Sequence, residues 1–318
     1  MLPNLIIPGV QKCATSAIHT YLAAHSQCVM SAPKEPHFFT ANWNRWTQRE
    51  YENCFPVKKE SDVRIWGEAS TTYFEHREAP KRIRDVLGPD TKIVVLLRSP
   101  ARRAVSAYWH MAKRFDERRN PEAVFGSLPE SLDDALIAEE SGVREAIRSG
   151  EIRTQRSLKL IGDRCRNFRY LRNSCYCDNL KRYEQTFGRR NTLVVLTEDL
   201  ADRPVATFGR IANFLRIDEE FSGADLNCRI NVTTLPKAGW MGRVVNSIAE
   251  TLPGGPALAL KNHVSALGRR LPPATPAHVR DRLDRLFRVH NQQLAKFLGR
   301  DLSVWRCSTP VMDYRRAC

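Results

Sequence analysis

Several patterns are missing from this chain of 318 residues, and each absence excludes a class of protein. No apolar run approaches the roughly 18 residues that a membrane-spanning helix needs. The nine cysteines form no paired CxxC motifs, and Cys175 and Cys177 are too close together for such a zinc site. No signal-peptide pattern precedes Leu5. We therefore expect a reduced, cytoplasmic protein; the alternative is the lumenal catalytic domain of a truncated membrane-anchored enzyme.

A nucleotide-binding signature is also incomplete. Gly9 is not followed by the Gly-Lys-Ser/Thr triplet of P-loop enzymes, because Lys12 precedes Cys13, Ala14 and Thr15. In those enzymes the hydroxyl of the triplet binds magnesium. Its absence argues against a nucleotide triphosphatase.

Positive charge is in excess, with 50 Lys and Arg against 35 Asp and Glu and a formal net charge of +15. Nucleic acid, an anionic membrane, an acidic glycan or a multiply phosphorylated cofactor would each be attracted to such a surface. A basic surface can also serve solubility alone. Charge by itself does not choose between these partners.

The stretch from residue 5 to residue 22 predicts a strand, a tight turn and a helix. An apolar run at residues 5–7 is typical of a buried parallel strand, and Pro8 and Gly9 end it. From Thr15 onward apolar residues recur at helical spacing. Small residues in the turn would let backbone N–H groups approach an anion at the helix N-terminus, where Lys12 adds charge. The turn is either a phosphate cradle or an ordinary strand-to-helix connection.

A carboxylate and an imidazole follow closely in residues 31–39. Two prolines bracket Lys34 and Glu35, which predicts an extended backbone with Glu35 and His37 on one side. Such a pair can deprotonate a hydroxyl group. The alternative is a surface loop in which Phe38 and Phe39 fill the core while Glu35 and His37 face solvent. We interpret residues 67–73 as a loop that supports the same site.

Arg98 ends a continuous apolar run at residues 92–98, which is typical of a central parallel strand. Its position predicts a place at the edge where α/β sheets bind ligands. Ser99 is a predicted N-cap and Pro100 the first helical residue, so Ser106 lies two turns into the next helix. The Arg98 guanidinium either grips a phosphate or pairs with a nearby carboxylate.

The rest of the chain alternates between strand and helix patterns, which predicts an α/β fold with a central parallel sheet flanked by helices. We expect a single domain over residues 1–318, with a charged helical insertion at about 114–160. Gly268, Arg269 and Arg270 form either a phosphate-binding loop or a basic linker. The predicted elements are helices at 79–86, 176–187, 205–215 and 276–298, and a strand at 192–197.

Together these motifs resemble sulfotransferases that use 3′-phosphoadenosine 5′-phosphosulfate, in the branch of heparan sulfate sulfotransferases and their bacterial relatives. The resemblance runs through most of the chain. It rests on the Gly-x-x-Lys turn from Gly9 to Ser16, the Lys-Glu-x-His-Phe-Phe signature at residues 34–39, Arg98 with Ser106, and the ending at residues 298–305. It implies a P-loop-like three-layer fold, a single sulfotransferase domain, and a C-terminal cofactor loop and helix at about 260–305.

The resemblance also implies a role for each matched residue. The general base would be Glu35, which would deprotonate an acceptor for in-line attack on sulfur, while Lys12 and His37 stabilise charge. No metal is expected, because Lys and Arg can neutralise the phosphates. The cofactor would be bound by Gly9, Lys12, Cys13, Ala14, Thr15, Ser16, Arg98, Ser106, Gly268, Arg269 and Arg270. The pair Cys13-Ala14 departs from the commoner small-Gly pair of the family, and Leu267 stands where the family often has Lys.

We therefore predict a transferase of the EC 2.8.2 class that sulfates a hydroxyl or amine of a carbohydrate or another small acceptor, with no nucleic-acid partner. Two other functions stay open. Magnesium-dependent turnover of ATP would favour a P-loop kinase-type phosphotransferase. Salt-sensitive binding that survives Lys12→Ala and Glu35→Ala would favour a non-enzymatic protein that binds polyanions or nucleic acid.

Overall fold

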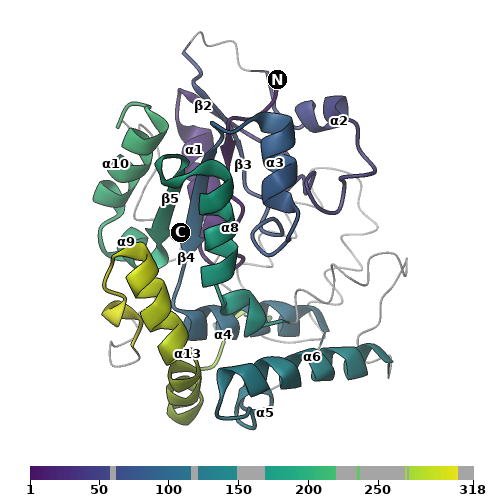
Figure 1. Ribbon diagram of the computed structural model, residues 1–318, viewed down its shortest axis with the longest axis vertical. Coiled ribbons are helices and arrows are strands. Elements are labelled where there is room, and N and C mark those ends of the chain that lie inside the picture. Colours follow the sequence, from purple (N-terminus) through teal and green to yellow (C-terminus); the bar gives the residue numbers. More distant parts are fainter. Residues whose placement is uncertain are drawn as a thin grey trace.

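Five parallel strands form a sheet at the centre of the molecule (Figure 1), in the order β2-β3-β1-β4-β5. The computed structural model describes residues 1–57, 62–115, 121–148, 169–219, 235–236, 269–270 and 272–306. The strands are β1 (Leu5–Ile6), β2 (Cys28–Met30), β3 (Ile65–Glu68), β4 (Lys92–Leu97) and β5 (Thr192–Leu196). In the pairing of β1 with β4, Leu5 lies opposite Lys92. The carboxyl ends of these two strands therefore meet at one edge, which is where parallel sheets bind ligands.

Four helices cover the two faces of the sheet: α1 (Thr15–Ala24), α3 (Ala79–Leu87), α8 (Cys177–Phe187) and α10 (Pro204–Leu215). On one face, α1 and α10 meet through Tyr21 and Phe208, whose ring centroids are 4.8 Å apart. On the other face, α3 and α8 lie side by side (Figure 1). Because both faces are covered, residues 93–97 of β4 are fully buried, which explains their continuous apolar sequence.

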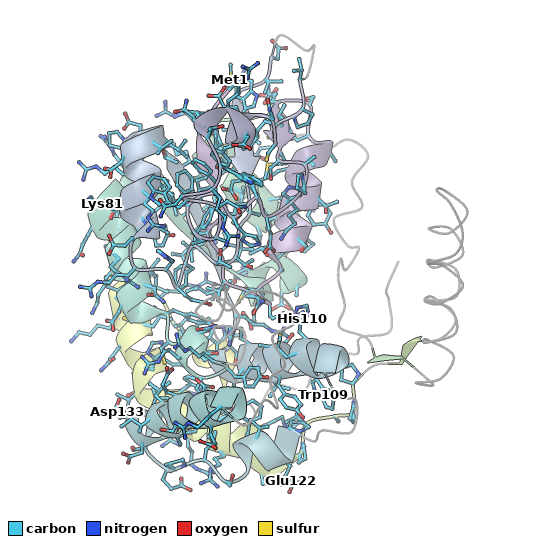
Figure 2. All side chains as sticks on the ribbon, turned by 90° about the vertical axis from the view of Figure 1, so that its right-hand side faces the viewer. Met1, Lys81, Trp109, His110, Glu122 and Asp133 are labelled. Carbon is cyan, nitrogen blue, oxygen red and sulfur yellow. The ribbon has the colours of Figure 1, made fainter. Side chains whose placement is uncertain are left out.

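A second hydrophobic core lies beyond the carboxyl edge of the sheet. It is built from α4 (Pro100–Phe115), α5 (Pro121–Phe125), α6 (Leu132–Arg148) and α13 (Ala277–Leu298). Tyr108, Phe125 and Phe287 are buried in it. Figure 2 shows this part, marked by Trp109, Glu122 and Asp133, at the opposite end of the molecule from Met1. The ligand-binding edge of the sheet is thus bordered by a helical layer.

The predicted α/β class and its parallel sheet are confirmed, and the predicted helices and strands differ from the observed ones by one or two residues at their ends. Ser99 caps α4 as predicted, because its Oγ accepts from the Arg102 amide at 3.4 Å. The sequence does not predict β2, which has only three residues, or β3, which contains Gly67 and Glu68. Of the predicted insertion, α5 and most of α6 are described. The remaining short elements are α2 (Gln48–Glu52), α9 (Thr197–Asp202), and the paired strands β6 (Leu235–Pro236) and β7 (Arg269–Arg270).

Across the described ranges, none of the helices has the length and apolar character required to cross a bilayer.

Candidate active site

The turn from Gly9 to Ser16 joins β1 to α1 and is fixed to the neighbouring strand. The Val10 amide donates to the Leu96 carbonyl at 3.0 Å, and the Leu96 amide donates to the Gly9 carbonyl at 2.9 Å. Lys12 and Ala14 have φ angles of 72° and 61°, which non-glycine residues rarely adopt. Ala14 is the N-cap of α1 and provides no side-chain cap. The first turn of α1 therefore begins without the usual side-chain acceptor, as an anion-binding helix terminus does.

Gly9 is required by the close approach of another loop. Its φ is +150°, and a Cβ added there would lie 3.0 Å from Cβ of Phe74 and 3.4 Å from the carbonyl oxygen of Thr71. The Phe74 amide also donates to the Pro8 carbonyl at 2.9 Å. The turn thus packs directly against the segment that follows β3.

Two guanidinium groups contact consecutive carbonyl oxygens of the turn. Nη1 of Arg98 lies 3.5 Å from the Lys12 oxygen, and Nη1 of Arg103 lies 3.5 Å from the Gln11 oxygen. Arg103 is fully buried, and it also donates from Nε to Ser174 Oγ at 2.7 Å and from Nη2 to the Tyr170 carbonyl at 2.6 Å. Arg103 is not among the residues predicted for the site. The signal for it is its place on the same helical stripe as the apolar residues of α4.

Arg98 lies directly after β4 and is half-buried, and Ser106 is half-buried two turns into α4. Within the described ranges, the Arg98 guanidinium forms no ion pair with a carboxylate. The corner that carries Arg98 is held by Glu198, whose Oε1 accepts from the Ser99 amide at 3.2 Å. Oε2 of the same carboxylate accepts from Nε1 of Trp305 at 3.0 Å. The predicted pairing of Arg98 with a carboxylate is therefore not found among these residues.

Cys13 occupies the interior of the turn. Burial raises the pKa of its thiol to about 12, so the thiol stays neutral and fills space. The neighbouring Tyr176 donates its hydroxyl to the Arg98 carbonyl at 2.9 Å. Thr15 is buried at the start of α1, and Ser16 is half-buried beside it.

Glu35 and His37 face each other, as predicted, but on a different backbone. Oε2 of Glu35 lies 3.5 Å from Nε2 of His37, and Oε1 lies 2.5 Å from Nζ of Lys34. The prediction of an extended backbone is wrong, because the φ angles of Glu35 and His37 are 63° and 52°. The His37 amide donates to Ser70 Oγ at 3.0 Å, and this contact holds the residue in its left-handed conformation. Phe38 and Phe39 are buried in the core, so the alternative reading is correct for these two side chains.

The loop after β3 supports this pair, as predicted. Thr71 donates its hydroxyl to Oε2 of Glu35 at 3.1 Å, and Thr72 Oγ1 lies 3.0 Å from Nδ1 of His37. The side chains of Glu35 and His37 are 28% and 31% exposed, so both can reach a ligand. The same Thr71 presents its carbonyl oxygen to Gly9. Thr71 therefore lies between the turn at Gly9–Ser16 and the pair formed by Glu35 and His37.

Glu68 is a fully buried carboxylate behind the pair, and the sequence reading does not single it out. It accepts from three hydroxyl groups, at 2.8 Å from Tyr51, 2.7 Å from Tyr73 and 2.5 Å from Ser70. Burial raises its pKa to about 7, although the three hydrogen bonds act in the opposite direction. A sequence signal exists in retrospect, since a Glu at the end of a buried strand needs polar partners.

The late basic loop of the predicted site is described only in part. Gly268 lies outside the described residues. Arg269 and Arg270 form β7, whose backbone pairs with residues 235–236. Their predicted role at the cofactor stays a prediction. Among the described side chains, no cluster of three His, Cys, Asp or Glu residues could hold a metal ion.

The sulfotransferase domain family matches residues 2–235, a range that contains all five strands of the sheet. The chain belongs to this family. The likeness predicted from the Gly9 turn, residues 34–39 and Arg98 is thereby confirmed at the level of the family.

Relatives of this sulfotransferase-family chain include two kinds of heparan sulfate enzyme. It is 24% identical over 306 residues to the bifunctional heparan sulfate N-deacetylase/N-sulfotransferase 1 of Caenorhabditis elegans, covering 94% of this chain and 30% of the relative. It is 30% identical over 218 residues to the human heparan sulfate glucosamine 3-O-sulfotransferase 3B1, covering 67% of this chain and 46% of the relative. The chain thus spans less than half the length of either relative.

A solved structure shares the fold. The sulfotransferase from Alicyclobacillus acidocaldarius superposes with a TM-score of 0.57 at 24% identity, covering 96% of this chain and 99% of that one. This likeness supports the three-layer α/β architecture described above.

Proposed function

We propose that this sulfotransferase-family chain transfers a sulfuryl group from 3′-phosphoadenosine 5′-phosphosulfate to a hydroxyl or amine of a carbohydrate acceptor. One observation carries the proposal. The Thr71 carbonyl oxygen lies 3.4 Å from where a Cβ on Gly9 would be, next to the turn, and the Thr71 hydroxyl donates to Glu35. An anion site and a general base are therefore adjacent, as transfer from an anionic donor requires.

The residues of the turn fit a phosphate-bearing donor. A helix N-terminus without a side-chain cap, Lys12, and the Arg98 guanidinium, which forms no ion pair with the described carboxylates, together favour anions. Lys12, Thr15 and Ser16 would hold the phosphosulfate end, and Arg98 with Ser106 the 3′-phosphate. When bound, the donor supplies an activated sulfuryl group. Lys12 and His37 would stabilise the negative charge that develops on its oxygens.

Glu35 is placed to remove the proton from the acceptor. A carboxylate offers about four lone-pair sites in total. Lys34 occupies one site on Oε1, while Thr71 and His37 approach Oε2. Among the described residues no other donor reaches Oε1, so its second site would take the acceptor proton. His37, held at Nδ1 by Thr72, keeps its ring against Glu35 and restricts the carboxylate to one orientation.

A carbohydrate acceptor is supported by the relatives, whose names state that they act on heparan sulfate. The net charge of +15 suits an anionic glycan. Because the chain spans only 30% of the N-deacetylase/N-sulfotransferase, only the sulfuryl-transfer step is proposed for it. A cytoplasmic location stays a prediction from the cysteine pattern.

Calorimetric titration of 3′-phosphoadenosine 5′-phosphate tests the donor site. We expect the wild type to bind it, and Arg98→Ala to bind it about 10- to 100-fold more weakly, which is the usual value of charge-assisted hydrogen bonds. Arg84→Ala is a matched control, because Arg84 is exposed on α3. A parallel assay measures transfer of labelled sulfate to chemically desulfated heparan sulfate. A wild type that does not bind the nucleotide would refute the proposed function.

A further inference from the structure

The backbone of the acid–base segment is attached to two hydroxyl groups. The His37 amide donates to Ser70 Oγ at 3.0 Å, and the Phe39 amide donates to the Tyr73 hydroxyl at 3.3 Å. The segment has φ angles of 52° at His37, the first anchored residue, and 63° at Glu35, two residues before it. Left-handed conformations at non-glycine residues persist only where the surroundings enforce them. The hydrogen bonds donated by the His37 and Phe39 amides are contacts of that kind.

Glu68 fixes the direction in which both hydroxyl groups point. Its Oε2 accepts from Ser70 Oγ at 2.5 Å, and its Oε1 accepts from the Tyr73 hydroxyl at 2.7 Å. When Glu68 is ionised its carboxylate can only accept, so both hydroxyl protons are then directed toward Glu68. The lone pairs of the two oxygens are then directed to the His37 and Phe39 amides. Glu68, Ser70 and Tyr73 are all fully buried, so water does not compete for these bonds.

We propose that Glu68 is a positioning residue for sulfuryl transfer, which acts through Ser70 and Tyr73 to hold Glu35 and His37 in their reactive arrangement. This inference rests on the proposed function. Glu68 does not touch the ligand in this scheme. It determines whether the base Glu35 and its partner His37 stay on the left-handed backbone that turns their side chains toward each other.

Replacing the carboxylate by an amide would disturb this arrangement without changing its size. The side-chain N–H₂ of a glutamine donates, so at least one of the surrounding hydroxyl groups would have to reverse. A reversed Ser70 or Tyr73 hydroxyl directs its proton at a backbone N–H and loses that bond. The reactive segment then has one anchor instead of two.

A matched pair of variants distinguishes a positioning role from the general effect of removing a buried hydroxyl group. Tyr51→Phe and Tyr73→Phe delete the same group, and both hydroxyls donate to Oε1 of Glu68 from fully buried rings. Only the Tyr73 hydroxyl also accepts from the acid–base segment, at the Phe39 amide. Ser70→Ala removes the second anchor. A positioning role therefore predicts different kinetics for two chemically identical changes.

We expect Tyr73→Phe and Ser70→Ala to lower kcat by about 10- to 100-fold, the scale of a small misplacement of reacting groups. The affinity for 3′-phosphoadenosine 5′-phosphate should stay within about twofold of wild type, because the turn at Gly9 is untouched. Tyr51→Phe should keep kcat within about twofold. Glu68→Gln should resemble Tyr73→Phe, and nucleotide binding shows whether each variant is folded.

Wild-type kcat in Tyr73→Phe and Ser70→Ala, or an equal loss in Tyr51→Phe, would overturn the inference while leaving the proposed function intact. A wild type without nucleotide binding or transfer would overturn both. Amide hydrogen exchange gives an assay that needs no substrate: Ser70→Ala should speed exchange at His37, and Tyr73→Phe at Phe39. Unchanged exchange at both amides would refute the anchoring on which the inference depends.

Discussion

The two halves of the candidate site are organised by groups of opposite charge. At the turn from Gly9 to Ser16, the proposed donor turn, Arg98 and Arg103 contact carbonyl oxygens of residues 11–12. At the acid–base segment, Glu68 directs two hydroxyl groups that accept backbone N–H groups. The first half thus has its backbone carbonyl groups bound by side chains, and the second half has its backbone N–H groups bound. The turn retains N–H groups for an anion, whereas the segment leaves proton handling to the side chains of Glu35 and His37.

The largest expected effect on turnover is at the acid–base segment, the half that Glu68 organises. Glu35→Gln should lower turnover by about 10²- to 10⁴-fold, the usual contribution of general acid–base catalysis. Nucleotide affinity should be unchanged, because Glu35 belongs to the other half of the site. Steady-state kinetics and calorimetry on the same preparation measure both quantities. Full turnover in this variant would remove Glu35 from the role of base.

The donor turn should respond differently to a single substitution. Lys12→Met should lower turnover by about 10²- to 10³-fold through lost charge stabilisation. Unlike Glu35→Gln, it should also weaken nucleotide binding. Lys81→Met makes the same change at an exposed position of α3 (Figure 2) and should have no effect. If Lys12→Met changed turnover alone, the two halves would not differ in the way proposed here.

Removing the buried guanidinium should cost stability as well as affinity. Arg103→Met removes the donor to Ser174 Oγ and one donor each to the Tyr170 and Gln11 carbonyls, although the Tyr170 carbonyl still accepts from the Ser174 hydroxyl. Each buried group left unpaired costs about 1–3 kcal/mol in the free energy of unfolding. Chemical denaturation should therefore give a clear loss. Arg102→Met, at the neighbouring and half-buried position, is the control and should lose much less.

The smallest effect is a difference in pH dependence between the halves. Burial raises the pKa of Glu68 from 4.5 to about 7, so between these values the folded state binds more protons than the unfolded state. The contribution of Glu68 to stability therefore falls as pH rises from 5 to 7, by at most about 3 kcal/mol. Arginine stays charged throughout this range.

Urea denaturation at several pH values measures this effect as a difference between wild type and Glu68→Gln. The variant should gain stability relative to wild type as pH rises. The subtraction also removes the contribution of Glu139, whose pKa burial likewise raises to about 7. A difference that stays constant from pH 5 to pH 8 would contradict the assignment of this titration to Glu68.

The parts of the fold that could be predicted are those with a strong local signal. The apolar run at 93–97 and the Ser99-Pro100 start of α4 predict the strand and helix around Arg98, because burial and capping act on neighbouring residues. The placement of Glu35 and His37 on one side of their segment could also be predicted, although from an extended backbone that the structure does not have. Strands β2 and β3 could not, because they are too short or too polar to give a pattern.

The unpredicted part of the site depends on contacts between distant segments. Arg103 is buried because residues 170–174 bring acceptors to it. The left-handed backbone at His37 depends on the hydroxyl of Ser70, 33 residues away, and local proline rules alone predict an extended chain. Sequence patterns therefore identify the reacting groups but not the groups that hold them.

The contact of Trp305 with Glu198 has a consequence for the order of events during synthesis. Glu198 holds the Ser99 amide with one oxygen and the Trp305 indole with the other, so the corner beside Arg98 has its full set of bonds only when Trp305 is present. Trp305 leaves the ribosome roughly 10–40 s after Ser99 at ordinary rates of translation. The nascent chain should therefore complete its sheet well before this corner acquires its last bond.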